Sequence, residues 1–153
     1  MSTVGSIKKV KINASYKFFG PDSTVSEIAD TMDIEDIGAV PVLDENHYLM
    51  GVVSERDIVR KLVKDGRDSD LVTAKDIMTK EVITVRKETT ILEALKLIKT
   101  NNIRHLPVVD EANKLLNFIS LRDIMGAPQS NRKLSLILIG FVVVLIPIIL
   151  IFK

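Results

Sequence analysis

The sequence predicts an α/β fold of two similar units related by a pseudo-two-fold axis, followed by one C-terminal transmembrane helix. The first observation is an internal repeat, in which residues 24–59 match residues 90–125 without a gap and with 12 of 36 positions identical. Within each copy, the apolar spacing alternates between the patterns of strands and of helices, which is typical of α/β proteins. The third observation is an uncharged run at residues 134–152, in which 16 of the 19 residues are apolar.

Each unit is predicted to run strand, helix, strand, strand, helix. Thr24 and Thr90 each precede a glutamate by three residues, and this capping-box spacing starts the first helix of each copy. The second helix of each copy starts after Ser54 or Ser120. Apolar runs bounded by polar turn residues indicate the strands. The predicted strands are 16–19, 39–43 and 48–53 in the first unit, and 82–85, 106–109 and 115–119 in the second.

The repeat also sets the predicted domain boundaries. The first unit spans residues 8–64 and the second spans 65–126, followed by a linker at 127–133 and the transmembrane helix at 134–152. A unit of about 50 residues is marginally stable alone, so we expect the two units to pack against each other. The basic run at residues 8–11 is expected to form a solvated strand edge.

The composition argues against several classes of function. Lys and Arg total 21 and Asp and Glu total 20, a balance that gives no support to nucleic-acid binding through bulk charge. The chain has no cysteine and two histidines, which exclude a thiolate metal site or a Cys nucleophile and argue against a His-rich metal site. We recognise no nucleophile–base pair and no phosphate-cradling glycine loop. The sequence therefore predicts a protein that is not an enzyme and has no metal or cofactor of its own.

The apolar run at residues 134–152 has the length of a membrane-spanning helix. At ~1.5 Å per residue, the run extends about 28 Å, close to the ~30 Å hydrocarbon core of a bilayer. A buried core helix is the alternative, but a domain this small cannot surround such a helix on every side. Arg132 and Lys133 precede the run and Lys153 follows it. By the positive-inside rule, we expect a single-pass membrane protein whose larger part is cytoplasmic.

A Ser-x-x-Asp pattern follows the last strand of each copy, at Ser54 and Asp57 and again at Ser120 and Asp123. The start of a helix offers free N–H groups to phosphate, and a carboxylate there can accept both hydroxyls of a ribose. The same spacing is also close to a capping box, which needs no ligand. The residues alone leave both interpretations open.

Five short motifs occur in the two copies: AVPVLD at 39–44, GVVSERDIV at 51–59, DIMT at 76–79, VITV at 82–85 and HLPVVD at 105–110. Taken together, these motifs resemble a tandem pair of CBS (cystathionine β-synthase) domains, often called a Bateman module. The resemblance covers about residues 8–126. In that family, such pairs bind adenine nucleotides or related adenosyl ligands between the repeats, bias an attached enzyme, channel or transporter, and often form flat homodimers.

The resemblance implies two crossed sites, each joining the Ser-x-x-Asp of one repeat to the first strand and the segment before proline of the other. The second site departs from the family pattern, because Asn117 replaces a glycine, Phe18 replaces a threonine and nothing basic precedes Pro41. We therefore expect one competent nucleotide site and one weaker site. The first comprises Gly51, Ser54, Arg56, Asp57, Thr84, Ile103, Arg104 and His105, and the second comprises Phe18, Gly38, Ala39, Ser120, Arg122 and Asp123.

The predicted function is that of a tail-anchored regulatory protein that senses AMP, ADP or ATP. A homodimer and a separate membrane-protein partner are expected, since the chain shows no effector domain. One alternative is a structural adaptor without a ligand, in which both Ser-x-x-Asp patterns act only as caps. Another is an accessory subunit of a transporter or channel, with a metal ion or nucleic acid as its ligand.

Overall fold

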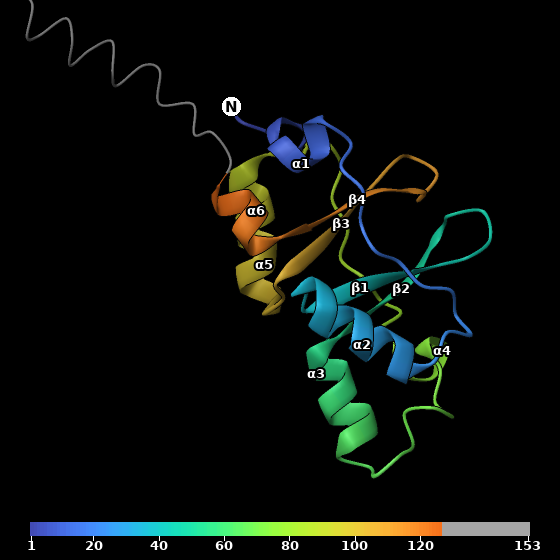
Figure 1. Cartoon of the computed structure of the whole chain (residues 1–153). Helices are drawn as coiled ribbons and strands as arrows, with labels where there is room; N and C mark the ends of the chain where they lie inside the picture. The colour runs from blue at the N-terminus through green and yellow to red at the C-terminus, as the bar shows by residue number, and fades with distance from the viewer. Residues whose placement is uncertain (127–153) are drawn as a thin grey trace, which may run out of the picture.

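The computed structural model describes residues 1–126, which fold into two side-by-side repeats (Figure 1). The predicted linker (127–133) and the predicted transmembrane helix (134–152) lie outside these residues. Within residues 1–126, no helix combines the length and the apolar character needed to cross a bilayer. The first repeat contains α2 (Val25–Glu35), β1 (Ala39–Leu43), β2 (Leu49–Ser54), α3 (Glu55–Ile58) and η2 (Val59–Val63), and the second contains α5 (Ile91–Asn101), β3 (His105–Val109), β4 (Leu115–Ser120) and α6 (Leu121–Met125).

The first helix of each repeat starts and ends in the same way. The Thr24 hydroxyl accepts a hydrogen bond from the backbone N–H of Glu27 at 3.2 Å, and the Glu27 carboxylate accepts one from the Thr24 N–H at 3.0 Å. Thr90 caps α5 through the same backbone contact. Both helices end at a residue in the left-handed region, Asp36 or Asn102. The predicted starts of these two helices are therefore confirmed.

Each repeat contains a small mixed sheet. β1 pairs with β2 and β3 pairs with β4, both antiparallel, and the register shifts at the same relative position in the two pairs. The strands predicted at 16–19 and 82–85 are much shorter than expected: they are reduced to single parallel bridges, Phe19 to Val42 and Val85 to Val108. The chain turns at residues 21–22 and 87–88 soon after each bridge, which ends the pairing.

The two cores exchange chain segments. The residues before α2, from the start of η1 (Val4–Ser6) to the end of α1 (Lys8–Lys11), contribute Val4, Ile7 and Val10 to the core of the second repeat. In return α4 (Ala74–Ile77) packs into the core of the first repeat (Figure 1). Backbone hydrogen bonds of 2.8 Å, from Val4 to Thr89 and from Ala74 to Ser23, fix the two exchanged segments. Each core thus contains residues from both predicted units (8–64 and 65–126).

Residues 8–11 form the helix α1, so the prediction of a strand edge there is wrong. Ile7 and Val10 are both buried and stand three positions apart, which is the spacing of one helix face. Of the two lysines between them, Lys8 is exposed and Lys9 is partly buried. Burial of this face against the second repeat therefore outweighs the local basic pattern.

The repeats meet at equivalent positions, as a pseudo-two-fold axis requires. Tyr48 and Lys114 form an antiparallel bridge, and Leu115 donates a backbone hydrogen bond to the His47 carbonyl at 3.2 Å. A small apolar cluster of Leu43, Val109 and Leu115 lies at this contact, with Leu49 packed against it. Leu43 and Val109 are equivalent positions of the two repeats, as are Leu49 and Leu115. The predicted α/β pair of related units is confirmed.

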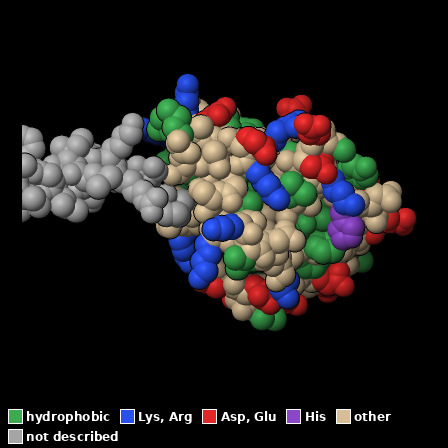
Figure 2. Space-filling view, turned by 90° about the horizontal axis from the view of Figure 1, so that it is seen from above, with side chains coloured by type: hydrophobic (Ala, Val, Ile, Leu, Met, Phe, Trp, Pro, Cys, Tyr) green, Lys and Arg blue, Asp and Glu red, His purple; other side chains and the backbone are tan. Residues whose placement is uncertain are grey.

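One face of the molecule carries charges of both signs. On the face seen from above Figure 1, basic and acidic side chains are interspersed and do not separate into fields of one sign (Figure 2). Such a surface produces little long-range attraction for a polyanion.

Candidate functional site

A cleft of about 1320 Å³ lies between the two repeats and is lined by residues of both. Its volume exceeds the roughly 300–1,000 Å³ typical of small-molecule sites, so it has room for a nucleotide. Both Ser-x-x-Asp patterns border it. Of the residues predicted for the two sites, those lining the cleft are Ser54, Arg56, Asp57, Ile103, Arg104 and His105 from the first set, and Gly38, Ala39, Ser120, Arg122 and Asp123 from the second.

The backbone brings these residues to the cleft in the same way in each repeat. The first N–H of α3, on Glu55, donates to the Gly38 carbonyl at 3.1 Å, and the first N–H of α6, on Leu121, donates to the Arg104 carbonyl at 2.8 Å. Each second helix therefore starts beside the segment that enters the first strand of its own repeat. The strand registers agree, since Ser54 pairs with Ala39 and Ser120 with His105. These backbone contacts join each Ser-x-x-Asp to its own repeat, and not to the other repeat as the crossed pairing expects. The two repeats also touch here, because the Arg56 guanidinium donates to the Asn102 carbonyl at 3.1 Å.

Gly51, Thr84 and Phe18 are not among the residues that line the cleft. Thr84 is partly buried. Phe18 is 46% exposed and packs edge-on against His47, with ring centroids 5.3 Å apart. These three predicted residues therefore contribute no surface to the cleft.

Gly51 allows the exchanged segment to approach β2. A Cβ atom at this position would lie 2.7 Å from Met78 Sδ and 2.9 Å from the Thr79 carbonyl oxygen, both too close. The neighbouring Val52 forms a backbone bridge to Thr79. The equivalent residue of the second repeat, Asn117, is buried and donates through Nδ2 to the Ala14 carbonyl at 3.1 Å. The Gly-to-Asn difference between the repeats is therefore structural.

We expect Gly51→Ala to lower the free energy of unfolding by about 1–3 kcal/mol, because its Cβ would overlap Met78 and the backbone of Thr79. Gly20→Ala is the matched control, since a Cβ at Gly20 meets nothing within 4 Å. Chemical denaturation of the two variants and the parent measures the difference. Equal stability of all three would show that the close approach at Gly51 is not required.

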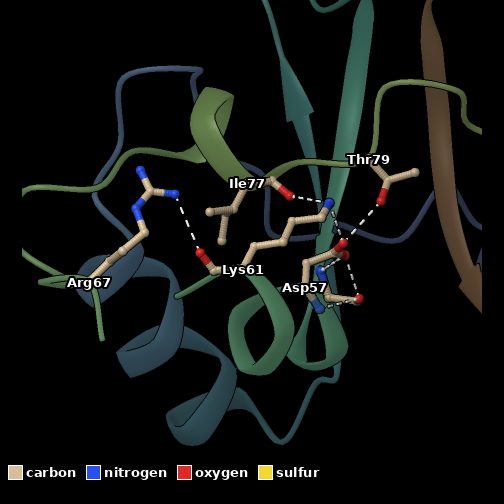
Figure 3. A network of polar contacts seen from close by, with 6 residues as sticks. Asp57, Lys61, Arg67, Ile77 and Thr79 are labelled. Atoms are coloured by element: carbon tan, nitrogen blue, oxygen red, sulfur yellow. Dashed lines mark hydrogen bonds and ion pairs between the residues drawn. The ribbon is translucent and has the colours of Figure 1, made fainter. Parts of the chain in front are cut away.

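The carboxylate of Asp57 has partners on both oxygens (Figure 3). Oδ2 accepts hydrogen bonds from the Ser54 N–H at 3.0 Å and the Ser54 hydroxyl at 2.6 Å. Oδ1 accepts one from the Thr79 hydroxyl at 3.0 Å and forms an ion pair with Lys61 Nζ at 2.7 Å. Burial by itself raises the pKa of Asp57, but the hydrogen bonds from Lys61 and Ser54 and the Lys61 charge outweigh it and lower the pKa. Asp57 is therefore an ionised capping residue in this structure.

Lys61 and Thr79 were not predicted as part of this site. Lys61 stands four residues after Asp57, a spacing that brings side chains together on a helix, so the sequence did carry a signal for this pair. The contact with Thr79 depends on the exchange of segments, for which the sequence has no local pattern. Lys61 Nζ also donates to the Ile77 carbonyl at 2.7 Å, which ties η2 to the exchanged segment.

Asp123 caps its own helix in the same manner as Asp57 but with fewer partners. Its Oδ2 accepts hydrogen bonds from the Ser120 N–H at 2.7 Å and the Ser120 hydroxyl at 2.8 Å. Its Oδ1 accepts none from residues 1–126. Both Ser-x-x-Asp patterns are thus capping boxes, and in the second one a carboxylate oxygen still has capacity to accept.

His105 stacks on Phe118 with ring centroids 5.5 Å apart and ring planes 2° from parallel. Burial lowers the pKa of His105, and the charges of Lys9 and Arg104 lower it further, against an opposing effect of Asp123. His105 is therefore neutral at pH 7 and offers a flat ring. Lys9 and the exposed Arg104, which both line the cleft, supply positive charge at this end of it. Within residues 1–126, no group of three or more His, Cys, Asp or Glu residues is placed to hold a metal ion.

Comparison with known proteins identifies the class to which this two-repeat α/β module belongs. The sequence profile of the CBS domain matches residues 7–64 and again residues 74–130. The two matches cover most of the chain, and the chain therefore belongs to the CBS domain family as a tandem pair. The resemblance stated from the sequence motifs is confirmed.

Two relatives show how far the similarity extends. A protein of Methanopyrus kandleri is 40% identical over 105 residues, covering 69% of this chain and 54% of that protein. The CBS domain-containing protein CBSX3 of Arabidopsis thaliana, named as mitochondrial, is 33% identical over 133 residues, covering 82% of this chain and 64% of that protein. This chain therefore matches between about half and two thirds of the length of these relatives.

Solved structures share the same fold. A protein with CBS domains from Burkholderia ambifaria has a TM-score of 0.75 and 30% identity, covering 85% of this chain and 96% of that chain. CBSX2, solved in complex with AMP, has a TM-score of 0.67 and 24% identity, covering 82% and 94%. The CBS pair of protein MJ0100, solved with 5′-methylthioadenosine and S-adenosyl-L-methionine, has a TM-score of 0.68 and 22% identity, also covering 82% and 94%. At these lower identities, the last two comparisons show the fold alone.

Proposed function

We propose that this chain is a membrane-anchored regulatory protein that binds AMP, ADP or ATP in the cleft between its two CBS repeats. One observation carries the proposal: a cleft of about 1320 Å³ is lined by both Ser-x-x-Asp patterns together with three arginines, Arg56, Arg104 and Arg122. Arginine is well suited to phosphate because its planar fork donates two parallel hydrogen bonds. The carboxylates supply acceptors for ribose hydroxyls. The proposal assigns the chain no reaction of its own.

The rest of the cleft suits an adenine ring. Val82, Ile83 and Ile103 line it with apolar surface. The stacked rings of His105 and Phe118 add a flat aromatic surface, against which an adenine base can stack. Ligand pockets commonly combine an apolar wall with a few placed polar groups, and this cleft has both. The ligands of CBSX2 and MJ0100 are adenosine derivatives, which supports the choice of nucleotide class.

Titration of AMP, ADP and ATP into the purified full chain, kept in mild detergent, tests the nucleotide proposal by calorimetry. Mass spectrometry of small molecules released from the same preparation identifies any ligand carried through purification. Binding of at least one nucleotide supports the proposal. If none binds, the adaptor alternative is favoured, because both Ser-x-x-Asp patterns already form capping boxes without a ligand.

The membrane anchor is proposed from the apolar run at residues 134–152 and its basic flank at Arg132 and Lys133. We expect residues 134–153 fused to a soluble reporter to move the reporter into the membrane fraction. We expect the chain without these residues to leave the membrane and remain folded, as measured by fractionation and circular dichroism. A truncated chain that unfolds or precipitates would indicate that the run belongs to a core. The orientation, with the repeats in the cytoplasm, rests on the positive-inside rule.

A regulatory role requires a target protein whose activity the bound ligand changes. We propose a separate membrane protein as the target and a homodimer of this chain as the acting form, both as the family resemblance implies. Co-purification from detergent extracts, followed by identification of the bound proteins, tests for the target. Recovery of a channel or transporter subunit with no nucleotide bound to this chain would favour the accessory-subunit alternative.

A further inference from the structure

The two halves of the cleft differ in one ionic contact. Asp57 Oδ1 forms an ion pair with the Lys61 ammonium at 2.7 Å and accepts a hydrogen bond from the Thr79 hydroxyl at 3.0 Å. The equivalent oxygen of Asp123 accepts no hydrogen bond from the part of the chain that the structure describes. The side chain of Asp57 is 13% exposed and that of Lys61 is 41% exposed, so the pair is partly shielded from water.

Two fixed groups hold the Lys61 ammonium in place. It lies between Asp57 Oδ1 and the Ile77 carbonyl oxygen, each 2.7 Å away (Figure 3). This double attachment differs from a surface ion pair, in which a flexible lysine has one partner and contributes little. The sequence explains why only one half of the cleft has the contact. The repeat offset of 66 places Ala127 at the position equivalent to Lys61, and alanine has no charge.

We propose that Lys61 competes within the molecule for the carboxylate oxygen of Asp57 that a ribose diol would use. This inference rests on the proposed nucleotide function. A carboxylate oxygen accepts about two hydrogen bonds, and Asp57 Oδ2 already accepts two from Ser54. Oδ1 likewise has two partners, Lys61 and Thr79. A diol therefore binds Asp57 only after the ammonium has moved away.

The competition lowers affinity without closing the site. When the competent form of a site is only partly populated, the apparent dissociation constant rises by the inverse of that fraction. A partly shielded ion pair with a second fixed partner corresponds to a change of about three- to tenfold in affinity. Lys61 thus sets the nucleotide concentration at which the Asp57 half of the cleft responds.

The test compares two probes that differ in the diol alone, AMP and 2′,3′-dideoxy-AMP. Both are titrated by calorimetry into the full chain in detergent, as the parent and as Lys61→Met, which removes the charge and keeps the length. We expect Lys61→Met to bind AMP about three- to tenfold more tightly and to bind the dideoxy probe with unchanged affinity. A general change in the shape of the cleft would alter both probes alike.

Three further variants complete the design. Lys64→Met is the matched control, because Lys64 is exposed and forms no ion pair with the described residues, and it should bind like the parent. Lys61→Arg keeps a cation near Asp57 and should also bind like the parent. Lys61→Gln replaces Lys61→Met if that variant unfolds, because glutamine retains a donor for the Ile77 carbonyl without a charge.

The remaining outcomes would contradict either the competition by Lys61 or the proposed nucleotide function. Weaker AMP binding by Lys61→Met would make Lys61 a ligand contact and overturn the inference. Unchanged AMP binding by Lys61→Met, or an equal gain for both probes, would also overturn it, while the proposed nucleotide function would stand. If neither the parent nor any variant binds AMP, ADP or ATP, the proposed function fails and the inference fails with it.

Discussion

Replacing Asp57 by alanine is expected to weaken nucleotide binding by roughly ten- to hundredfold, while Asp123→Ala retains the affinity of the parent. A carboxylate that accepts ribose hydroxyls contributes about 1.5–3 kcal/mol to binding, which corresponds to that factor. The two aspartates are equivalent in the repeat, so each serves as the matched control for the other. This expectation follows the crossed-site prediction, which joins Asp57 to Arg104 and Asp123 to Gly38 and Ala39. Because the structure sets Arg104 beside the start of α6, a larger loss of affinity for Asp123→Ala would show instead that each site forms within one repeat.

Both aspartates also cap a helix, and the cost of losing a cap must be separated from the loss of a ligand contact. Removing such a cap costs about 0.5–2 kcal/mol of stability. Asp57→Ala additionally leaves Lys61 and Thr79 without an acceptor, so its loss of stability should be the larger of the two. Denaturation curves and calorimetric titrations of AMP, ADP and ATP on the same samples separate the two effects. Equal losses of affinity in the two variants would contradict a single competent site.

Cutting the chain after Gly66 is expected to abolish folding of each fragment alone and to permit folding when the two are mixed. Gly66 is exposed, with a left-handed φ of 63°, and lies in the connection between the repeats. Fragment 1–66 carries Val4 and Ile7, which belong to the core of the second repeat. Fragment 67–153 carries Ile77, which belongs to the core of the first. Each fragment therefore lacks part of its own core, and small units do not tolerate such a loss.

Circular dichroism of the separate and mixed fragments, in detergent, measures this effect. Ile7→Asp within fragment 1–66 provides the control, because Ile7 contributes only to the other fragment's core. This substitution should prevent recovery on mixing, whereas Lys11→Asp, at an exposed position of the same short helix, should permit it. Two independent thermal transitions in the uncut chain would contradict the prediction, because they would show that each repeat has a complete core of its own.

The features that the sequence predicted well are those with a local cause. A threonine three residues before a glutamate caps α2 and α5 because both partners lie in one helical turn. The strand pairs β1 with β2 and β3 with β4 follow from apolar runs joined by polar turns. The first strand of each unit was overestimated, because its apolar residues pack in a core or against the other repeat without forming a ladder.

The exchange of segments and the helix α1 could not be predicted from the sequence in this way. Val4, Ile7 and Val10 show only weak helical spacing, and nothing nearby indicates that their partners lie some 80 to 120 residues further along the chain. The same reason applies to the site. The Ser-x-x-Asp caps are local and were predicted, whereas the Asp57 contact with Thr79 depends on where an exchanged segment lies after folding.

The exchange also sets an order of events during synthesis of the protein. The first repeat completes its core only after Met78 has left the ribosome, and Val4 finds its last partners only once Ile124 has been made. At roughly 5–20 residues per second, the synthesis of the chain from Val4 to Ile124 takes on the order of 6–24 seconds. During that time the core that receives Val4, Ile7 and Val10 is incomplete. The N-terminal segment of the nascent chain is therefore the place where chaperones would be needed most.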